Sequence, residues 1–170
     1  MKIKALSLCA LFCAALTASA QIIIPTPLGI PLTVSTLMIF LLSSVFPELC
    51  LKTVIVYVLC GALGIGVFSG FSGGLGILLS PVGGYISGYI PMAFFCSKKT
   101  DSKLRSALFC IIGISLCHIL GFIFYLLYQK TAALPSFLFF TAIYVKDLIF
   151  CILAKGMGKN IKKALNSKGF

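Results

Sequence analysis

Apolar residues occur along this chain in six long runs, which are separated by short segments rich in charge, proline or glycine. A helix needs about 20 apolar residues, with a range of about 17–25, to cross the hydrocarbon core of a bilayer. The pattern therefore predicts an all-α membrane protein, a single domain over residues 1–170, in which six transmembrane helices form a compact bundle. The predicted spans are residues 5–24, 32–46, 53–67, 81–96, 106–128 and 134–154, the second of them on the short side.

The charged residues between the runs predict how the bundle is oriented. If the N-terminus is cytoplasmic, 12 of the 14 Lys and Arg residues fall in cytoplasmic segments. The outer loops then hold only Lys130, and Lys146 lies inside the last run. Such an excess on one side is what the positive-inside rule requires. We therefore predict a multi-pass protein of the cytoplasmic membrane with both termini in the cytoplasm.

The first run has a second interpretation, because it also resembles a secretory signal peptide. Two lysines precede its apolar core, and an A-x-A-like sequence ends it at residues 18–20. Cleavage would leave five spans, and the charge pattern would fit that arrangement too. Two features favour a retained helix: the apolar character continues through residues 22–24, and Ala10, Ala14 and Ala18 form a stripe at which another helix can approach closely.

Composition supports the membrane class and excludes several others. The chain is 60% hydrophobic and 10% charged, whereas soluble domains are about 45–50% apolar and about 25% charged. A net charge of +11 raises the possibility of nucleic-acid binding, but the basic residues lie in short clusters between apolar runs and no nucleic-acid motif is present. The eight cysteines are scattered without a C-x-x-C pair, so no metal site is predicted.

Residues 67–89, which read VFSGFSGGLGILLSPVGGYISGY, are the first candidate for a ligand pocket. Glycine and proline interrupt regular structure, and irregular backbone at membrane depth survives only where it is buried in protein or lines a polar cavity. Interrupted apolar segments of this kind also mark substrate sites in transporters. The alternative is that the glycines serve only to let helices pack closely.

Few ionisable residues are available for chemistry. Glu48 and Asp101 fall in predicted cytoplasmic loops, where we expect them to be solvated. Asp147 lies within the last apolar run, where a charge is costly and therefore indicates function. A simple ion pair with Lys146 is the alternative, but adjacent helix positions do not share a face, so we expect poor geometry for it. His118 is interpreted as a packed or hydrogen-bonded residue rather than a ligand.

The segment SGFSGGLGILLSPVGGYISGY resembles the signature of the BioY family, the biotin-specific S components of energy-coupling-factor (ECF) transporters. The family pattern ends in G-P-T-G-G-Y. Residues 80–85 read S-P-V-G-G-Y, so Pro and Gly-Gly-Tyr are kept while Gly and Thr are replaced. The last helix of such proteins carries D-x-x-K. Asp147 matches its Asp, but Phe150 stands at the Lys position, and we expect Lys146 to lie on another side of the helix and not simply to replace it.

The resemblance implies biotin uptake by a substrate-binding subunit, in a pocket between the glycine-rich stretch and the last helix. Ser69, Ser72 and Tyr85 are suited to hydrogen-bond the ureido ring of biotin, and Phe68 and Phe71 to contact its apolar thiophane ring. The resemblance implies no catalytic role and no cofactor of its own, because no Walker A motif is present and ECF S components dock on a transmembrane coupling subunit that carries two ATPases. The alternatives are an S component for another vitamin, given Phe150, and a non-transporting membrane scaffold. The alanine stripe would face the coupling subunit, and the predicted substrate-binding residues are Phe71, Ser72, Gly73, Gly74, Gly83, Gly84, Tyr85, Lys146 and Asp147.

Overall fold

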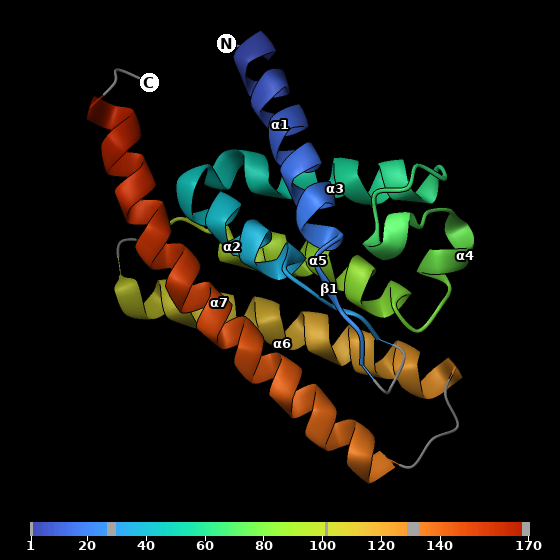
Figure 1. Ribbon diagram of the computed structural model, residues 1–170. Coiled ribbons are helices and arrows are strands. Elements are labelled where there is room, and N and C mark those ends of the chain that lie inside the picture. Colours follow the sequence, from blue (N-terminus) through green and yellow to red (C-terminus); the bar gives the residue numbers. More distant parts are fainter. Residues whose placement is uncertain (1, 27–29, 101, 129–132, 168–170) are drawn as a thin grey trace.

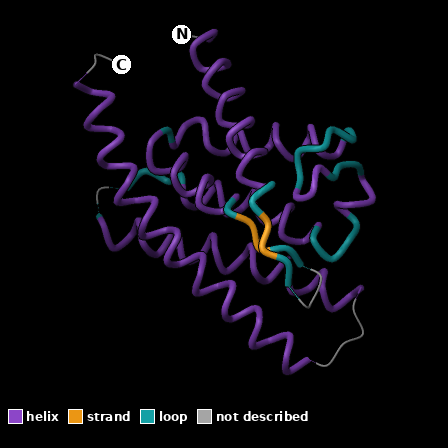
Figure 2. The backbone as a smooth tube through the Cα atoms, viewed as in Figure 1, coloured by secondary structure: helices purple, strands orange, loops and turns teal. Residues whose placement is uncertain are grey.

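The computed structural model describes residues 2–26, 30–100, 102–128 and 133–167, which fold almost entirely into helices (Figure 1; Figure 2). The predicted all-helical class is confirmed. Pro27, Gly29, Asp101, Lys130 and Lys168, which entered the sequence interpretation, lie outside the described residues. The elements are α1 (Lys2–Ala20), β1 (Ile23–Ile24), β2 (Leu32–Thr33), α2 (Ser35–Val45), α3 (Pro47–Ala62), η1 (Ser69–Phe71), α4 (Leu75–Leu78), α5 (Gly83–Cys96), α6 (Lys103–Tyr128) and α7 (Ala133–Ser167).

Each of the six predicted spans overlaps one of the longer helices, but the first helix does not end where the apolar run ends. Helix α1 stops at Ala20, and Ile23–Ile24 instead pair with Leu32–Thr33 as a short antiparallel hairpin. The reason is Pro25, because a residue that precedes proline is pushed out of the helical region into extended backbone. The uncharged turn predicted after the first span is therefore partly a β-hairpin.

Helix α3 begins earlier than predicted. It starts with Pro47 at its first turn, a favoured position for proline, so Glu48 and Lys52 belong to the helix rather than to a loop between spans. It ends at Ala62, and Gly64 follows with a φ of +93°, a conformation that glycine adopts readily. The Ile65 N–H then donates to the Cys60 carbonyl at 3.1 Å, which closes the helix end.

Helix α7 continues well beyond its predicted span. Its 35 residues correspond to about 52 Å at about 1.5 Å per residue, whereas a hydrocarbon core is about 30 Å thick. The helix that holds Asp147 thus also carries Lys155, Lys159, Lys162 and Lys163. Helix α7 crosses α6 in front, and the start of α1 and the end of α7 lie at the same end of the molecule (Figure 1).

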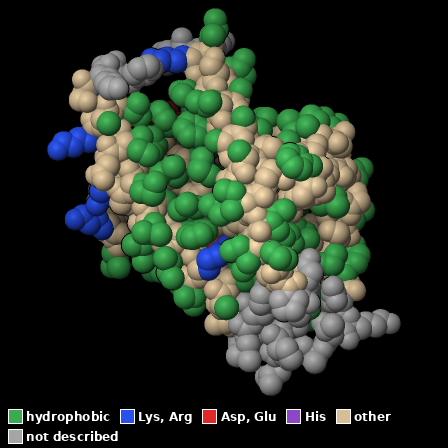
Figure 3. All heavy atoms as spheres, viewed as in Figure 1, with side chains coloured by type: hydrophobic (Ala, Val, Ile, Leu, Met, Phe, Trp, Pro, Cys, Tyr) green, Lys and Arg blue, Asp and Glu red, His purple; other side chains and the backbone are tan. Residues whose placement is uncertain are grey.

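Within the described residues, two helical segments are by themselves long and apolar enough to cross a bilayer, Ile3–Ala20 and Lys103–Tyr128. The number of spans and the cytoplasmic location of the termini stay predictions. The surface agrees with a lipid environment: apolar side chains cover most of the face in Figure 3, and the lysines there lie mainly over the C-terminal half of α7. Leu63, Leu127 and Ile152 are each more than 70% exposed.

Glycines bring α5 and α6 into the most extensive helix contact of the bundle. A Cβ atom on Gly84 would lie 2.5 Å from the Leu120 carbonyl oxygen, and one on Gly88 would lie 2.8 Å from the Cys117 Cα. No larger side chain fits at these distances. For these two positions the alternative interpretation of the glycine-rich stretch, close helix packing, is confirmed.

Candidate functional site

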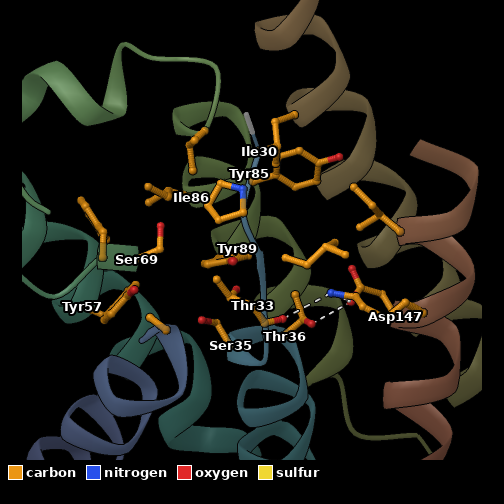
Figure 4. Close-up of a pocket in the computed structure, with 17 residues that line it drawn as sticks. Ile30, Thr33, Ser35, Thr36, Tyr57, Ser69, Tyr85, Ile86, Tyr89 and Asp147 are labelled. Atoms are coloured by element: carbon orange, nitrogen blue, oxygen red, sulfur yellow. Dashed lines mark hydrogen bonds and ion pairs between the residues drawn. The ribbon is translucent and has the colours of Figure 1, made fainter. Parts of the chain in front are cut away.

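A cavity of about 40 Å³ lies where the end of α1, the β-hairpin, α2, α3, α5 and α7 converge (Figure 4). This volume exceeds the roughly 10–15 Å³ that one water molecule requires. Its wall combines apolar side chains with hydroxyl groups and one charged pair, the composition typical of small-ligand sites. The lining residues are Ala20, Ile30, Pro31, Leu32, Thr33, Ser35, Thr36, Tyr57, Phe68, Ser69, Val82, Tyr85, Ile86, Tyr89, Ile143, Lys146 and Asp147.

Asp147 is the polar centre of this cavity. Only 2% of the residue is exposed, and three side chains from three helices contact its carboxylate. Thr36 donates to Oδ1 at 2.7 Å, Lys146 pairs with Oδ1 at 2.9 Å, and His118 Nε2 lies 3.0 Å from Oδ2. A buried carboxylate is tolerated only when it is paired in this way. Figure 4 shows Thr36 on α2 facing Asp147 across the cavity.

Two expectations about Lys146 are wrong. The lysine does form an ion pair with its neighbour Asp147, because its long side chain bends back over the helix. It also lies on the same side of α7 as Phe150, since residues four apart are neighbours on a helix surface. Its ammonium lies 5.2 Å from the centre of the Phe150 ring, a cation–π contact. A lysine ammonium therefore lies beside position 150, although the lysine itself stands one turn earlier.

Sequence reasoning assigned His118 no site role, yet it is part of the Asp147 network. Its ring is 8% exposed and packs edge-on against Tyr85 and Tyr144 at centroid distances of 5.5 and 5.3 Å. Nε2 contacts Asp147, while Nδ1 is buried without a protein partner. An ionisable residue in an apolar run was the available signal. The ring and Thr36 thus contact different oxygens of the carboxylate.

The first part of the glycine-rich stretch reaches the cavity through Phe68 and Ser69, and its later part lines the cavity with four residues of the α5 region. The Phe68 ring packs directly on Gly61 of α3, where any side chain would clash with it. Gln21, just after α1, holds the backbone of this segment: its Nε2 donates to the Phe68 carbonyl at 3.0 Å, and its Oε1 accepts from the Phe71 N–H at 3.0 Å. We call residues 68–72 the cavity loop.

The structure separates the predicted substrate-binding residues into two groups. Tyr85, Lys146 and Asp147 line the cavity together, whereas the others stand outside its wall. Phe71 is 75% exposed with a φ of +53°, and the Ser72 hydroxyl donates to the Ser69 carbonyl at 2.8 Å. The glycines shape backbone instead: a Cβ atom on Gly73 would lie 2.5 Å from the Ile65 carbonyl oxygen, and Gly74 has a φ of +97°. Gly83 and Gly84 pack on α4 and α6, respectively.

Several lining residues were missed because nothing in their local sequence distinguishes them. Thr36 and Ser35 begin α2, and their hydroxyls within an apolar run were the only available signal. Tyr57 lies mid-way along α3 and donates to the Val67 carbonyl at 3.0 Å. Tyr89 lies one turn after Tyr85 on α5 and so shares its face. These residues supply most of the hydroxyl groups of the cavity.

The alanine stripe of α1 lies outside the site, on the surface. Ala10, Ala14 and Ala18 are all exposed, while Leu16 and Ala20 on another side of the helix are 2% exposed and belong to the core. Because Ala20 also lines the cavity, loss of α1 would open both the core and the site. Helix α1 is therefore an integral part of this fold.

Fold and site together define a small helical protein with a largely apolar surface and a partly open cavity that contains a buried carboxylate. Comparison with known proteins gives the family: the BioY family model matches residues 1–167, and the chain belongs to the BioY family. It is 38% identical over 122 residues to a probable biotin transporter BioY of Pyrococcus horikoshii, covering 71% of this chain and 74% of that protein. It is 29% identical over 157 residues to a probable biotin transporter BioY of Rickettsia prowazekii, which covers 88% of this chain and 80% of that protein.

The fold also has a solved counterpart. The crystal structure of the S component for biotin from an ECF-type ABC transporter superposes with a TM-score of 0.81 at 19% identity, covering 95% of this chain and 92% of that chain. The likeness establishes the arrangement of helices. It extends over almost the whole chain, so no large part of the fold is peculiar to this protein.

Proposed function

We propose that this chain captures biotin from the outer face of the cytoplasmic membrane and is the substrate-binding subunit of an ECF-type transporter. Family membership and the names of its relatives support the choice of ligand. The observation that carries the proposal is the Asp147–Lys146 pair, buried at the wall of a cavity that also offers hydroxyls and apolar surface.

The cavity chemistry matches the parts of biotin. The ureido group of biotin both donates and accepts hydrogen bonds. The hydroxyls of Ser69 and Tyr89 can donate or accept in return, and the Asp147 carboxylate can accept. The apolar ring system suits Phe68 and Ile86. The carboxylate requires a cation, and Lys146 is the only lysine in the cavity wall among the described residues. Its ammonium has three N–H donors, of which the structure directs one to Asp147 and one, at 3.4 Å, to the Thr33 carbonyl.

Binding of labelled biotin to the purified full-length protein in detergent tests the proposal. The variant is Asp147→Asn, and the matched control is Glu48→Gln, the same carboxylate-to-amide change at an exposed site. Hydrogen bonds that involve a charged group contribute about 1.5–3 kcal/mol each, so we expect Asp147→Asn to weaken binding about a hundredfold and the control to bind normally. Thermal unfolding of both variants shows whether the fold survives.

Two outcomes would overturn this assignment. If wild-type protein binds no biotin at micromolar concentration, the ligand is a different one, and the same assay with other vitamins identifies it. If Asp147→Asn binds as tightly as wild type, biotin stays the ligand but its anchor is elsewhere in the cavity. A protein that binds no small molecule at all would be a scaffold instead.

We further propose that energy for uptake comes from a partner. The exposed alanine stripe on α1 offers a flat surface of small side chains, which is how transmembrane helices approach each other closely. A transmembrane coupling subunit that carries ATPase subunits is the partner that this surface fits. The chain itself then contributes binding and release of the ligand rather than catalysis.

A further inference from the structure

A second cavity, of about 510 Å³, lies at the opposite end of the bundle from the ligand cavity. The ligand cavity uses the start of α2, the start of α5 and the middle of α7, whereas this one uses the end of α2, the end of α5, the start of α6 and the later part of α7. We call it the basic groove. It is lined by six lysines, Lys98, Lys99, Lys103, Lys155, Lys159 and Lys162.

The floor of the groove is made of hydroxyl groups. Ser43 and Ser44 come from α2, Ser97 ends α5, and Ser106 lies in the first turn of α6. Helix α7 reaches this floor because Gly158 packs directly on the Ser44 side chain, where a Cβ atom would clash. The hydroxyls of Ser43 and Ser97 donate to the Phe40 and Ala93 carbonyls of their own helices, so the donors open to an anion are chiefly the lysine ammoniums, which suit the oxygens of a phosphate group.

Two of the lysines are held in position rather than extended into solvent. The half-buried Lys155 donates to the Ser106 carbonyl and hydroxyl at 3.3 and 3.1 Å. The ammonium of Lys98 lies 5.0, 5.6 and 5.2 Å from the ring centres of Phe94, Phe95 and Phe109. The positive-inside rule accounts for the number of lysines at one end of a bundle. It does not account for lysines of three segments converging on one hollow.

The lining of the groove contains no acidic side chain among the described residues. Among the described residues of this region, Glu48 is the one acid, and it contacts Lys99 at 2.6 Å on the outer surface. The hydrogen bond from Lys99 lowers the pKa of Glu48, so this pair is ionised at neutral pH. Five lysines are left around the hollow with no acid paired to them in the structure. The groove therefore favours an anion.

Apolar side chains beside the groove indicate which anion. Phe94, Leu104 and Leu108 are 46%, 70% and 50% exposed, and they flank the groove on α5 and α6. Basic pockets between transmembrane helices on the cytoplasmic side bind the headgroups of anionic lipids. We propose that the basic groove is a binding site for the phosphate headgroup of an anionic phospholipid, whose acyl chains lie along this apolar flank.

The test uses the purified full-length protein in a zwitterionic detergent and phosphatidylglycerol that carries a fluorescent label on an acyl chain. Phosphatidylcholine with the same label measures binding without net headgroup charge. The groove variant is Lys103→Gln/Lys155→Gln/Lys159→Gln. The matched control, Lys52→Gln/Arg105→Gln/Lys163→Gln, removes the same charge from residues outside the groove lining. Biotin binding by each protein reports that the distant ligand cavity is still folded.

We expect the wild type to prefer phosphatidylglycerol and the control variant to bind it normally. The groove variant should bind it about a hundredfold more weakly, because it loses three lysines that each contribute about 1 kcal/mol near an anionic headgroup. Equal losses in both triple variants would refute the proposal, because net charge alone would then explain the preference. Displacement of the lipid by millimolar inorganic phosphate would identify a free-phosphate site instead. Unchanged lipid binding, with lost assembly of the coupling module, would make the groove a protein-docking surface.

Discussion

The lysine and the phenylalanine near Asp147 stand at other positions than in the family pattern D-x-x-K, where position 150 would be the lysine. The lysine of D-x-x-K follows the aspartate by one turn, whereas here the lysine directly precedes it and its ammonium rests over the ring at position 150. The phenylalanine therefore does more than fill space, because its π face attracts the cation. The cavity wall of this chain thus carries a lysine, at position 146 rather than at position 150. The choice between biotin and another vitamin depends on whether this lysine still reaches a carboxylate.

Replacing Lys146 by Gln should weaken binding of biotin but not of biotin amide, which lacks the carboxylate. A charge-assisted hydrogen bond contributes about 2 kcal/mol, which is about a thirtyfold change in Kd. Titrating wild type and Lys146→Gln with both ligands gives a double-mutant cycle that isolates this contact from any change in the fold. Lys162→Gln, far from the cavity, is the matched control. Equal losses for biotin and its amide would place the carboxylate elsewhere.

At this scale the sequence predicted Asp147 and Lys146 as site residues, but neither their contact with each other nor the contacts of Asp147 with Thr36 and His118. Asp147 was predictable because a carboxylate in an apolar run must have a function or a partner. Thr36 contacts it from 111 residues away, and no local pattern encodes such a pairing. The ion pair between Lys146 and Asp147 was not expected, because adjacent positions point to different sides of a helix. That argument considered backbone positions alone, whereas the four-carbon side chain of lysine can reach around the helix.

At the scale of elements, the side chain of Gln21 holds the cavity loop in position. Gln21 uses both ends of its amide to hold the loop from α1, as donor to the Phe68 carbonyl and acceptor from the Phe71 N–H. Because Phe68 and Ser69 belong to the cavity wall, this contact keeps the wall closed. The exposed Phe71, in left-handed backbone, marks the strained part of the loop.

Gln21→Glu should open the loop without altering the cavity wall itself. A carboxylate still accepts from the Phe71 N–H but repels the Phe68 carbonyl, so one hydrogen bond of about 1 kcal/mol is lost. We expect biotin to dissociate about five times faster, measured by chase with unlabelled ligand. Gln129→Glu, the other glutamine of the chain, is the control. An unchanged dissociation rate would mean that the loop does not limit release.

Ala14→Leu should disrupt assembly with the coupling module while sparing biotin binding. The larger side chain would project from the exposed stripe and keep a partner helix from approaching closely. Co-purification of the coupling subunit with the tagged variant measures assembly. Ala164→Leu, an equal change at an exposed position of α7, is the control. Normal recovery of the complex with Ala14→Leu would place the interface on another surface.

The helices themselves were largely predictable, and their ends were not. Apolar runs fix which segments are helical, since only helices satisfy the backbone inside a bilayer. Their bounds depend on local rules that hydropathy does not contain: Pro25 converts residues 22–24 from predicted helix to hairpin, and Pro47 starts α3 before its apolar run. The glycines of residues 67–89 were assigned to ligand contact, but most of them permit tight turns and close packing.

At the scale of the whole molecule, the ligand cavity and the basic groove lie at opposite ends of the bundle. The charges that line the ligand cavity nearly cancel, whereas those that line the basic groove are positive. This polarity agrees with a ligand cavity on the outer side and a lysine-rich end in the cytoplasm, which is the orientation that the charge pattern predicts. The start of α1 and the end of α7 both lie at the lysine-rich end (Figure 1).

Labelling of intact cells with a membrane-impermeant maleimide tests this orientation. A cysteine at Ile24→Cys, exposed in the hairpin, should react in intact cells. One at Lys163→Cys, exposed near the end of α7, should react only after the membrane is permeabilised. The wild-type chain gives the background from its native cysteines. The reverse pattern would invert the orientation, and labelling of both sites in intact cells would mean an odd number of spans.

Helix α1 carries the alanine stripe along its length and ends at Ala20, which lines the ligand cavity, and Gln21 just after it holds the cavity loop. A partner that shifts this helix must therefore alter ligand affinity, and the free-energy coupling between two sites acts equally in both directions. The factor by which docking loosens biotin is then the factor by which biotin loosens docking. An empty subunit would then bind the coupling module more tightly than a biotin-loaded one. A loaded subunit would displace an empty one from the module only when the loaded form is abundant.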